Sequence, residues 1–75
     1  MPKVPRITGE QAVRAFGKAG FNLDRVRGAH HILRHAERAP RLSIPVHKGR
    51  IVGGGLLCAQ IKVAGLTVEQ FCELL

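Results

Sequence analysis

The histidines are the residues of this 75-residue chain whose chemistry stands out, and there are four of them. His30, His31 and His35 lie close together, and His47 follows a short distance later. An imidazole titrates near neutral pH, so a histidine beside a phosphate can accept a proton from a ribose hydroxyl, or donate one to a leaving oxygen, without a metal. For each histidine the simpler alternative is a side chain that only adds contact area, and the residue types leave both interpretations open.

Other kinds of site find less support. The histidines with Cys58 and Cys72 are possible zinc ligands, but their spacing matches no common zinc pattern. Gly53-Gly54-Gly55 lacks the Lys-Ser/Thr ending of a P-loop and the spacing of a dinucleotide fingerprint, so a flexible turn is favoured over a phosphate cradle. No Ser-His-Asp arrangement is recognisable, since Asp24 is the only aspartate. The sequence predicts neither a metal nor another cofactor.

The charge of the chain is strongly positive and unevenly distributed. Twelve Lys and Arg against five Asp and Glu give a net charge of +7, and eleven of the twelve basic residues precede residue 51. This excess favours a polyanionic partner over a merely solvated basic surface. Without Trp or Tyr, and with three Phe at core spacing, recognition is expected through backbone and shape rather than base stacking. The basic residues on the expected strands and their loops are Arg25, Arg27, Arg34, Arg38, Arg41, Lys48 and Arg50.

Hydrophobic spacing and capping signals indicate the elements that must position these residues. A capping box, Thr8 with Gln11, precedes a one-sided helix expected over residues 9–19. Strands are expected over residues 21–26, 30–35 and 42–47, and Pro45 places the third at a sheet edge because proline cannot donate to a ladder. Strand alternation sends His30, Ile32 and Arg34 to one face, and His31, Leu33 and His35 to the other.

Two more helices are expected after the strands. The first covers residues 56–64, and a second capping box, Thr67 with Gln70, opens a short amphipathic helix at the end of the chain. The helix over residues 56–64 has one apolar line at Leu57, Ile61 and Ala64 and another at Leu56, Ala59 and Val63. One sheet face cannot cover both lines, so the second is either deeply buried or a surface for a partner.

The chain as a whole is expected to form one small domain over residues 1–75. Its predicted class is α+β, ordered α-β-β-β-α with a short extra helix, with a three-stranded antiparallel sheet packed on helices. No apolar run reaches the roughly 18 residues of a membrane helix, and no signal sequence is apparent. The cysteines are therefore expected to be reduced and buried in a cytoplasmic protein.

Three motifs occur in order along the chain: Gly28-Ala29-His30-His31-Ile32-Leu33-Arg34-His35, then Ile44-Pro45-Val46-His47, then Ala64-Gly65-Leu66-Thr67. Together they resemble the HicA toxin family, the YcfA-like mRNA interferases of HicA/HicB type II toxin–antitoxin systems, over nearly the whole chain. Ala29 stands where that family usually has the serine of a Gly-Ser-His motif. Gly53-Gly54-Gly55-Leu56 stands where relatives often have a Lys-Pro-Gly-Thr type segment.

The resemblance implies a double-stranded-RNA-binding-domain-like fold, metal-independent cleavage of mRNA in a stress response, and neutralisation by a HicB-like antitoxin. It carries the catalytic role to His30, as general base or acid when a ribose 2′-hydroxyl attacks the adjacent phosphate. A non-catalytic RNA-binding module of the same fold is the alternative. The antitoxin, or a second copy of the chain, is expected on Leu56, Ala59 and Val63; the free protein is expected to be a monomer or small oligomer. RNA contacts are expected from Arg27, Arg34, His47, Lys48 and Arg50.

Overall fold

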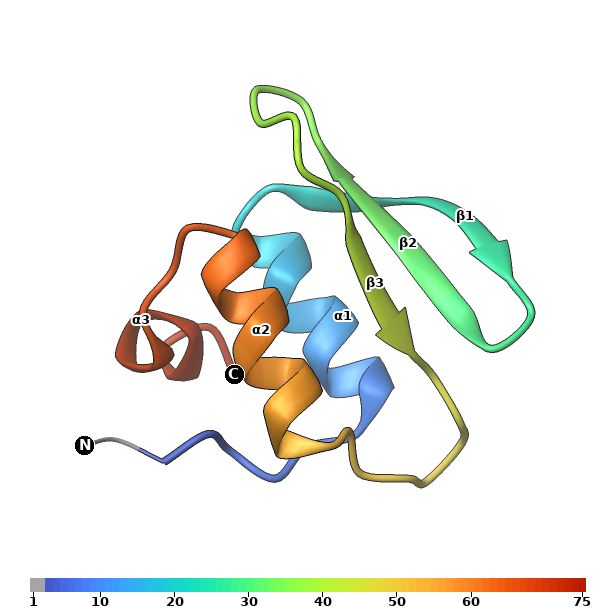
Figure 1. Ribbon diagram of the computed structural model, residues 1–75, viewed down its shortest axis with the longest axis vertical. Helices are drawn as coiled ribbons and strands as arrows, with labels where there is room; N and C mark the ends of the chain where they lie inside the picture. The colour runs from blue at the N-terminus through green and yellow to red at the C-terminus, as the bar shows by residue number, and fades with distance from the viewer. Residues whose placement is uncertain (1–2) are drawn as a thin grey trace.

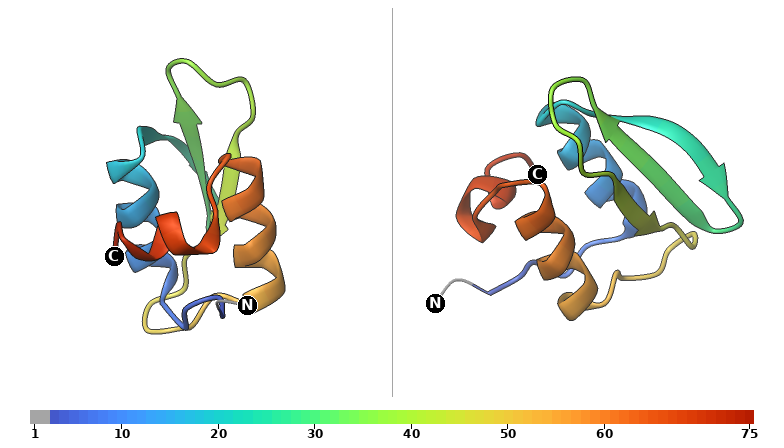
Figure 2. Two further views of the ribbon diagram at one scale, coloured as in Figure 1. Left: turned by 90° about the vertical axis from the view of Figure 1, so that its left-hand side faces the viewer. Right: turned by 45° about the horizontal axis from the view of Figure 1, so that its top comes forward.

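The computed structural model describes residues 3–75 and confirms the expected α+β order (Figure 1). The elements are α1 (Gly9–Lys18), β1 (Phe21–Arg27), β2 (His30–His35), β3 (Leu42–Pro45), α2 (Gly54–Val63) and α3 (Val68–Cys72). The strands form one antiparallel sheet in the order β1-β2-β3. Helices α1 and α2 cover one face of this sheet, and α3 lies on their far side (Figures 1 and 2). Within the described residues, no helix is long and apolar enough to cross a membrane.

Helix α1 is fixed at both ends by the signals that the sequence carries. The Thr8 side chain accepts a hydrogen bond from the Gln11 backbone N–H, and the Gln11 side chain accepts one from the Thr8 backbone N–H. At the other end Gly20 adopts a φ of 98°, a left-handed conformation that glycine tolerates best. Because the chain reverses there, Phe21 turns back into the core at the start of β1.

The sheet contains one irregularity that the sequence did not reveal. Leu23 lies opposite Leu33 and Arg25 lies opposite Ile32, so Asp24 is an extra residue in a bulge of β1. The bulge shifts the alternation of β1 and places Leu23 and Val26 on the same face. It explains why residues 21–26 show no clean alternation in the sequence.

Helix α2 begins earlier than expected and resolves the question of its two apolar lines. It starts at Gly54 rather than Leu56, with Gly53 at its N-cap, so two residues of the glycine run are helical instead of forming a turn. The line at Leu57, Ile61 and Ala64 is buried in the core. The second line is not deeply buried: Leu56, Ala59 and Val63 are exposed.

The core joins both layers through three aromatic rings. Phe16 of α1 lies between Phe21 of β1 and Phe71 of α3, with ring-centre distances of 6.3 Å and 4.7 Å respectively. All three rings are buried, as their spacing indicated. The expectation for the cysteines is wrong for Cys72, which is exposed because it closes a five-residue helix of which only Phe71 is buried, and Cys58 is half-buried.

Replacing Gly9 with alanine is expected to destabilise the fold, because α1 begins in direct contact with the end of β3. A Cβ at Gly9 would overlap the Pro45 carbonyl oxygen and lie 2.9 Å from the Val46 Cα, and neither backbone atom can move aside freely. The expected cost is about 1–3 kcal/mol in the free energy of unfolding, measured by urea denaturation. Gly17, whose Cβ would meet nothing within 4 Å, is the matched control, and Gly17→Ala should stabilise the helix by about 0.5–1 kcal/mol. Equal effects of the two substitutions would contradict this packing.

Candidate functional site

The face of the sheet that the helices leave uncovered, here called the open face, carries His30. Its members follow from the register: Asn22, Arg25 and Arg27 of β1, His30, Ile32 and Arg34 of β2, and Ser43 and Pro45 of β3. His30 is exposed at the first position of β2 and lies directly opposite Arg27 on one side and Pro45 on the other. Directly opposite residues project to the same face, so the imidazole and the Arg27 guanidinium share one surface.

A basic turn is tied to the same end of the sheet. His47, Lys48 and Arg50 are all exposed, and the Arg50 N–H donates to the His47 carbonyl oxygen (2.9 Å) to close the turn. At its N-terminal end the turn is held by a hydrogen bond from the Val46 N–H to the Ala29 carbonyl oxygen (2.7 Å).

The C-terminal end of the basic turn is held by the segment before α1. Ile51 forms a bridge with Thr8, and the Val52 N–H donates to the Ile7 carbonyl oxygen at 2.9 Å. Figure 1 shows the β1–β2 turn and the segment after β3 at one end of the molecule. The fold therefore gathers Arg27, His30 and the basic turn at that end.

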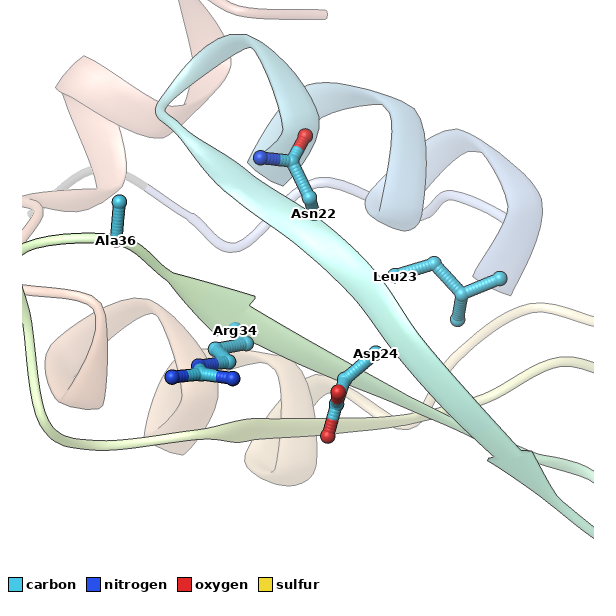
Figure 3. A pocket seen from close by; sticks show the side chains of 5 residues that line it. All are labelled: Asn22, Leu23, Asp24, Arg34 and Ala36. Atoms are coloured by element: carbon cyan, nitrogen blue, oxygen red, sulfur yellow. The ribbon is translucent and has the colours of Figure 1, made fainter.

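Arg34 lies on the open face but at the opposite end of β2. It is four residues beyond His30, which corresponds to about 13 Å along a strand. It lines a shallow hollow of about 370 Å³ together with Asn22, Leu23, Asp24 and Ala36 (Figure 3). In Figure 3 the side chains of Arg34 and Asp24 extend toward the same side. Arg34 is thus separated from the five cationic and histidine side chains at the other end, which are Arg27, His30, His47, Lys48 and Arg50.

The other two strand histidines face the helices, as alternation predicts. His35 is half-buried against Phe21, at 4.9 Å between ring centres, and its Nδ1 accepts a hydrogen bond from the Glu37 N–H (3.0 Å). His31 is half-buried, and its Nδ1 is buried without a hydrogen-bond partner. Neither side chain shares a surface with His30, so these histidines belong to the packing of the sheet on the helices.

The electrostatics of the open face are almost entirely cationic. Among residues 3–75 the recorded ion pairs are those of Asp24, with Arg41 at 3.7 Å and Arg25 at 3.9 Å. Within the part of the chain that the structure describes, Arg27, Lys48 and Arg50 therefore have no carboxylate within ion-pair distance. Arg25 lies on this face because the register places it opposite Ile32, a position that residue types alone do not give.

The structure also shows how the possible metal ligands and the apolar residues of α2 are arranged. No group of three or more His, Cys, Asp or Glu among residues 3–75 is arranged to hold a metal ion. Leu56, Ala59 and Val63 form an exposed apolar line along α2, and the exposed fractions of Leu56 and Val63 are 39% and 41%. This line lies on a helix, and the helices cover the opposite side of the sheet from His30.

The side chains at the His30 end of the sheet are of the types that bind a phosphate group and transfer protons beside it. An exposed imidazole can exchange a proton with a bound hydroxyl, and cations without carboxylate partners can stabilise a phosphate that gains negative charge. Arg27 is fixed on a strand, while Lys48 and Arg50 project from a turn anchored on both sides.

The chain was compared with known protein families and with curated proteins. A family model described as HicA toxin of bacterial toxin-antitoxin matches residues 9–66. The matched range extends from the start of α1 to the segment after α2, and it includes every candidate site residue named above. No curated protein matches the chain.

Proposed function

The chain belongs to the HicA toxin family and is therefore the toxin of a toxin–antitoxin system, and we propose that it cleaves messenger RNA as a metal-independent endoribonuclease with His30 at the catalytic centre. The proposed substrate is cytoplasmic mRNA, and a HicB-like antitoxin is the proposed inhibitor. The observation that supports this proposal best is the exposed His30 directly opposite Arg27, at the end of the sheet where the turn with His47, Lys48 and Arg50 is anchored.

The proposed reaction is a transfer within the RNA backbone. The ribose 2′-oxygen attacks the adjacent phosphorus, the bond from phosphorus to the 5′-oxygen of the next nucleotide breaks, and that oxygen leaves as a hydroxyl. His30 either accepts the 2′-hydroxyl proton or donates the proton that the leaving oxygen takes up. Arg27, Lys48 and Arg50 stabilise the negative charge of the transition state. The products are a 2′,3′-cyclic phosphate and a 5′-hydroxyl end.

Arg34 has a different role in this proposal. At about 13 Å from His30 along β2 it is too far away to contact the same phosphate, so it binds the RNA backbone further along the strand. Together with Arg25 it extends the cationic surface over the length of the open face. Binding of this kind contributes affinity and little sequence preference.

A comparison of RNA with DNA tests the proposed reaction directly. DNA of the same sequence carries the phosphates but lacks the 2′-hydroxyl, so we expect it to bind to the protein and compete with RNA without being cut. The products are separated on a denaturing gel. Treatment of the RNA products with an enzyme that acts on 2′,3′-cyclic phosphates, in parallel with a phosphatase that does not, identifies the ends. Cleavage of the DNA, or RNA products with 5′-phosphates, would contradict attack by the 2′-hydroxyl.

The apolar line on α2 is the proposed docking surface for the antitoxin. Leu56 and Val63 are exposed although the adjacent line at Leu57 and Ile61 is buried, and family membership supplies an antitoxin partner that can cover them. Covering these side chains with a partner removes apolar surface from water, which favours association.

Replacing Leu56 and Val63 together with glutamine is expected to weaken antitoxin binding about tenfold or more, since full burial of a Leu or Val side chain is worth about 1.5–3 kcal/mol. The measurement is titration of the toxin with its antitoxin by calorimetry. Lys62→Gln, an exposed change on the same helix, is the control and should bind like the unmodified protein. Unchanged affinity in the double variant would exclude this line as the docking surface, and loss of folding by circular dichroism would identify it as core.

A further inference from the structure

The two edges of the sheet differ in how their backbone groups are protected. At the β3 edge, the Ser43 N–H donates to the Gln60 side-chain oxygen (3.0 Å), and Pro45 has no N–H to offer. The β1 edge has no proline, six of its seven residues are exposed, and no side chain among residues 3–75 hydrogen-bonds its backbone. An unprotected edge strand is a template for pairing with another strand.

The register shows which backbone groups of β1 point outward. The Val46 N–H donates to the Ala29 carbonyl oxygen, so these two residues form a hydrogen-bonded pair beside the β2–β3 ladder. Hydrogen-bonded pairs occur at every second position of an antiparallel ladder, so the next two are His31 with Ile44 and Leu33 with Leu42. The backbone N–H and C=O groups of the intervening β2 residues therefore point toward β1, where the opposite residues are Asn22, Arg25 and Arg27. The N–H and C=O groups of Leu23 and Val26 are consequently directed to the free edge.

Along this edge two apolar side chains, Leu23 and Val26, flank two oppositely charged ones, Asp24 and Arg25. Leu23 and Val26 are 53% and 51% exposed, and the bulge at Asp24 places both on the face toward the helices. Figure 1 shows the β1–β2 hairpin extending past α1, and more than half of each of these two side chains is exposed. The Asp24 carboxylate is 3.7 Å from Arg41 and 3.9 Å from Arg25, longer than a hydrogen bond, and so it can accept a closer partner.

We propose that β1 pairs with β1 of a second copy of this chain, antiparallel and around a two-fold axis. The segment Leu23-Asp24-Arg25-Val26 is self-complementary in that arrangement: Leu23 lies opposite the second copy's Val26, and Asp24 lies opposite its Arg25. Each of these pairs occurs twice because of the symmetry. The outward backbone groups of Leu23 and Val26 then form hydrogen bonds across the axis.

The resulting dimer has one continuous sheet with both open faces on the same side. Opposite residues of paired strands share a face, so the four exposed apolar side chains cover one another on the helix side. The interface is a single strand pair between chains that each carry a net charge of +7, so association is weak, in the micromolar range, and needs salt to screen the repulsion.

Reversing the charges of Asp24 and Arg25 tests the proposed pairing of β1 with β1 of a second copy. Asp24→Arg and Arg25→Asp each place like charges opposite one another at two symmetric positions, so each is expected to weaken the dimer about tenfold. The double variant D24R/R25D restores opposite charges and should regain the original dissociation constant. The measurement is sedimentation equilibrium from micromolar to millimolar protein at physiological salt, and circular dichroism checks the fold of each variant.

The two single variants change the net charge in opposite directions, which separates pairing from general repulsion. If Asp24→Arg weakened and Arg25→Asp strengthened the dimer, net charge would explain the result and the strand pairing would be wrong. A protein that stays monomeric over the whole concentration range would also overturn the proposal. So would a dimer that the single variants leave unchanged, because a different surface would then hold it.

Discussion

Replacing His30 with alanine is expected to lower the rate of RNA cleavage by about 10²–10⁴-fold, the usual contribution of a positioned acid or base. The imidazole is exposed at the start of β2, so its removal leaves no cavity in the core and no unpaired buried group. RNA affinity should therefore change little. The measurement is single-turnover cleavage of a labelled RNA at saturating protein, alongside a binding titration.

His47 provides the matched control for His30. It is an exposed histidine near the same end of the sheet, but it belongs to the basic turn rather than to β2. His47→Ala is expected to weaken RNA binding modestly and to leave the saturated cleavage rate within a few-fold of the original. Equal losses of the saturated rate in the two variants would remove the distinction between a catalytic His30 and a contact.

Replacing Phe16 with alanine is expected to cost about 3–5 kcal/mol in the free energy of unfolding. The ring is completely buried between Phe21 and Phe71, so its removal separates α1, β1 and α3 at once. A domain of 75 residues has only about 4–11 kcal/mol of stability, so the variant should be partly or wholly unfolded at body temperature.

Urea denaturation followed by circular dichroism measures this effect, since the chain has no Trp or Tyr for fluorescence. Val63→Ala, a truncation of an exposed side chain on α2, is the control and should change the stability by no more than about 0.5 kcal/mol. A Phe16→Ala variant as stable as Val63→Ala would contradict the central place of the ring in the core.

Local sequence signals were sufficient for most of the fold. The capping boxes at Thr8 and Thr67 have short-range partners three residues away, and the structure contains both. Pro45 marked the edge strand because its missing N–H excludes it from a central strand. Alternation along β2 separated His30 from His31 and His35 because the period of a strand is fixed.

The features that the sequence did not reveal depend on contacts between distant segments. The bulge at Asp24 is defined only by which residues of β2 lie opposite β1. The early start of α2 at Gly54 runs against the low helix propensity of glycine, and the buried Leu57 and Ile61 anchor the helix that contains it. Arg34 was grouped with the other cations by residue type, but the length of β2 separates it from His30.

The most direct test of the proposed activity is incubation of the purified protein with a long mRNA in excess EDTA, in parallel with His30→Ala, followed on a denaturing gel. The proposal predicts cleavage by the unmodified protein despite the chelator, product formation by the variant that is slower by at least about a hundredfold, and equal RNA binding by both in a gel shift. RNA binding without cleavage by either protein would contradict it, and would identify the domain as an RNA-binding module without catalytic activity.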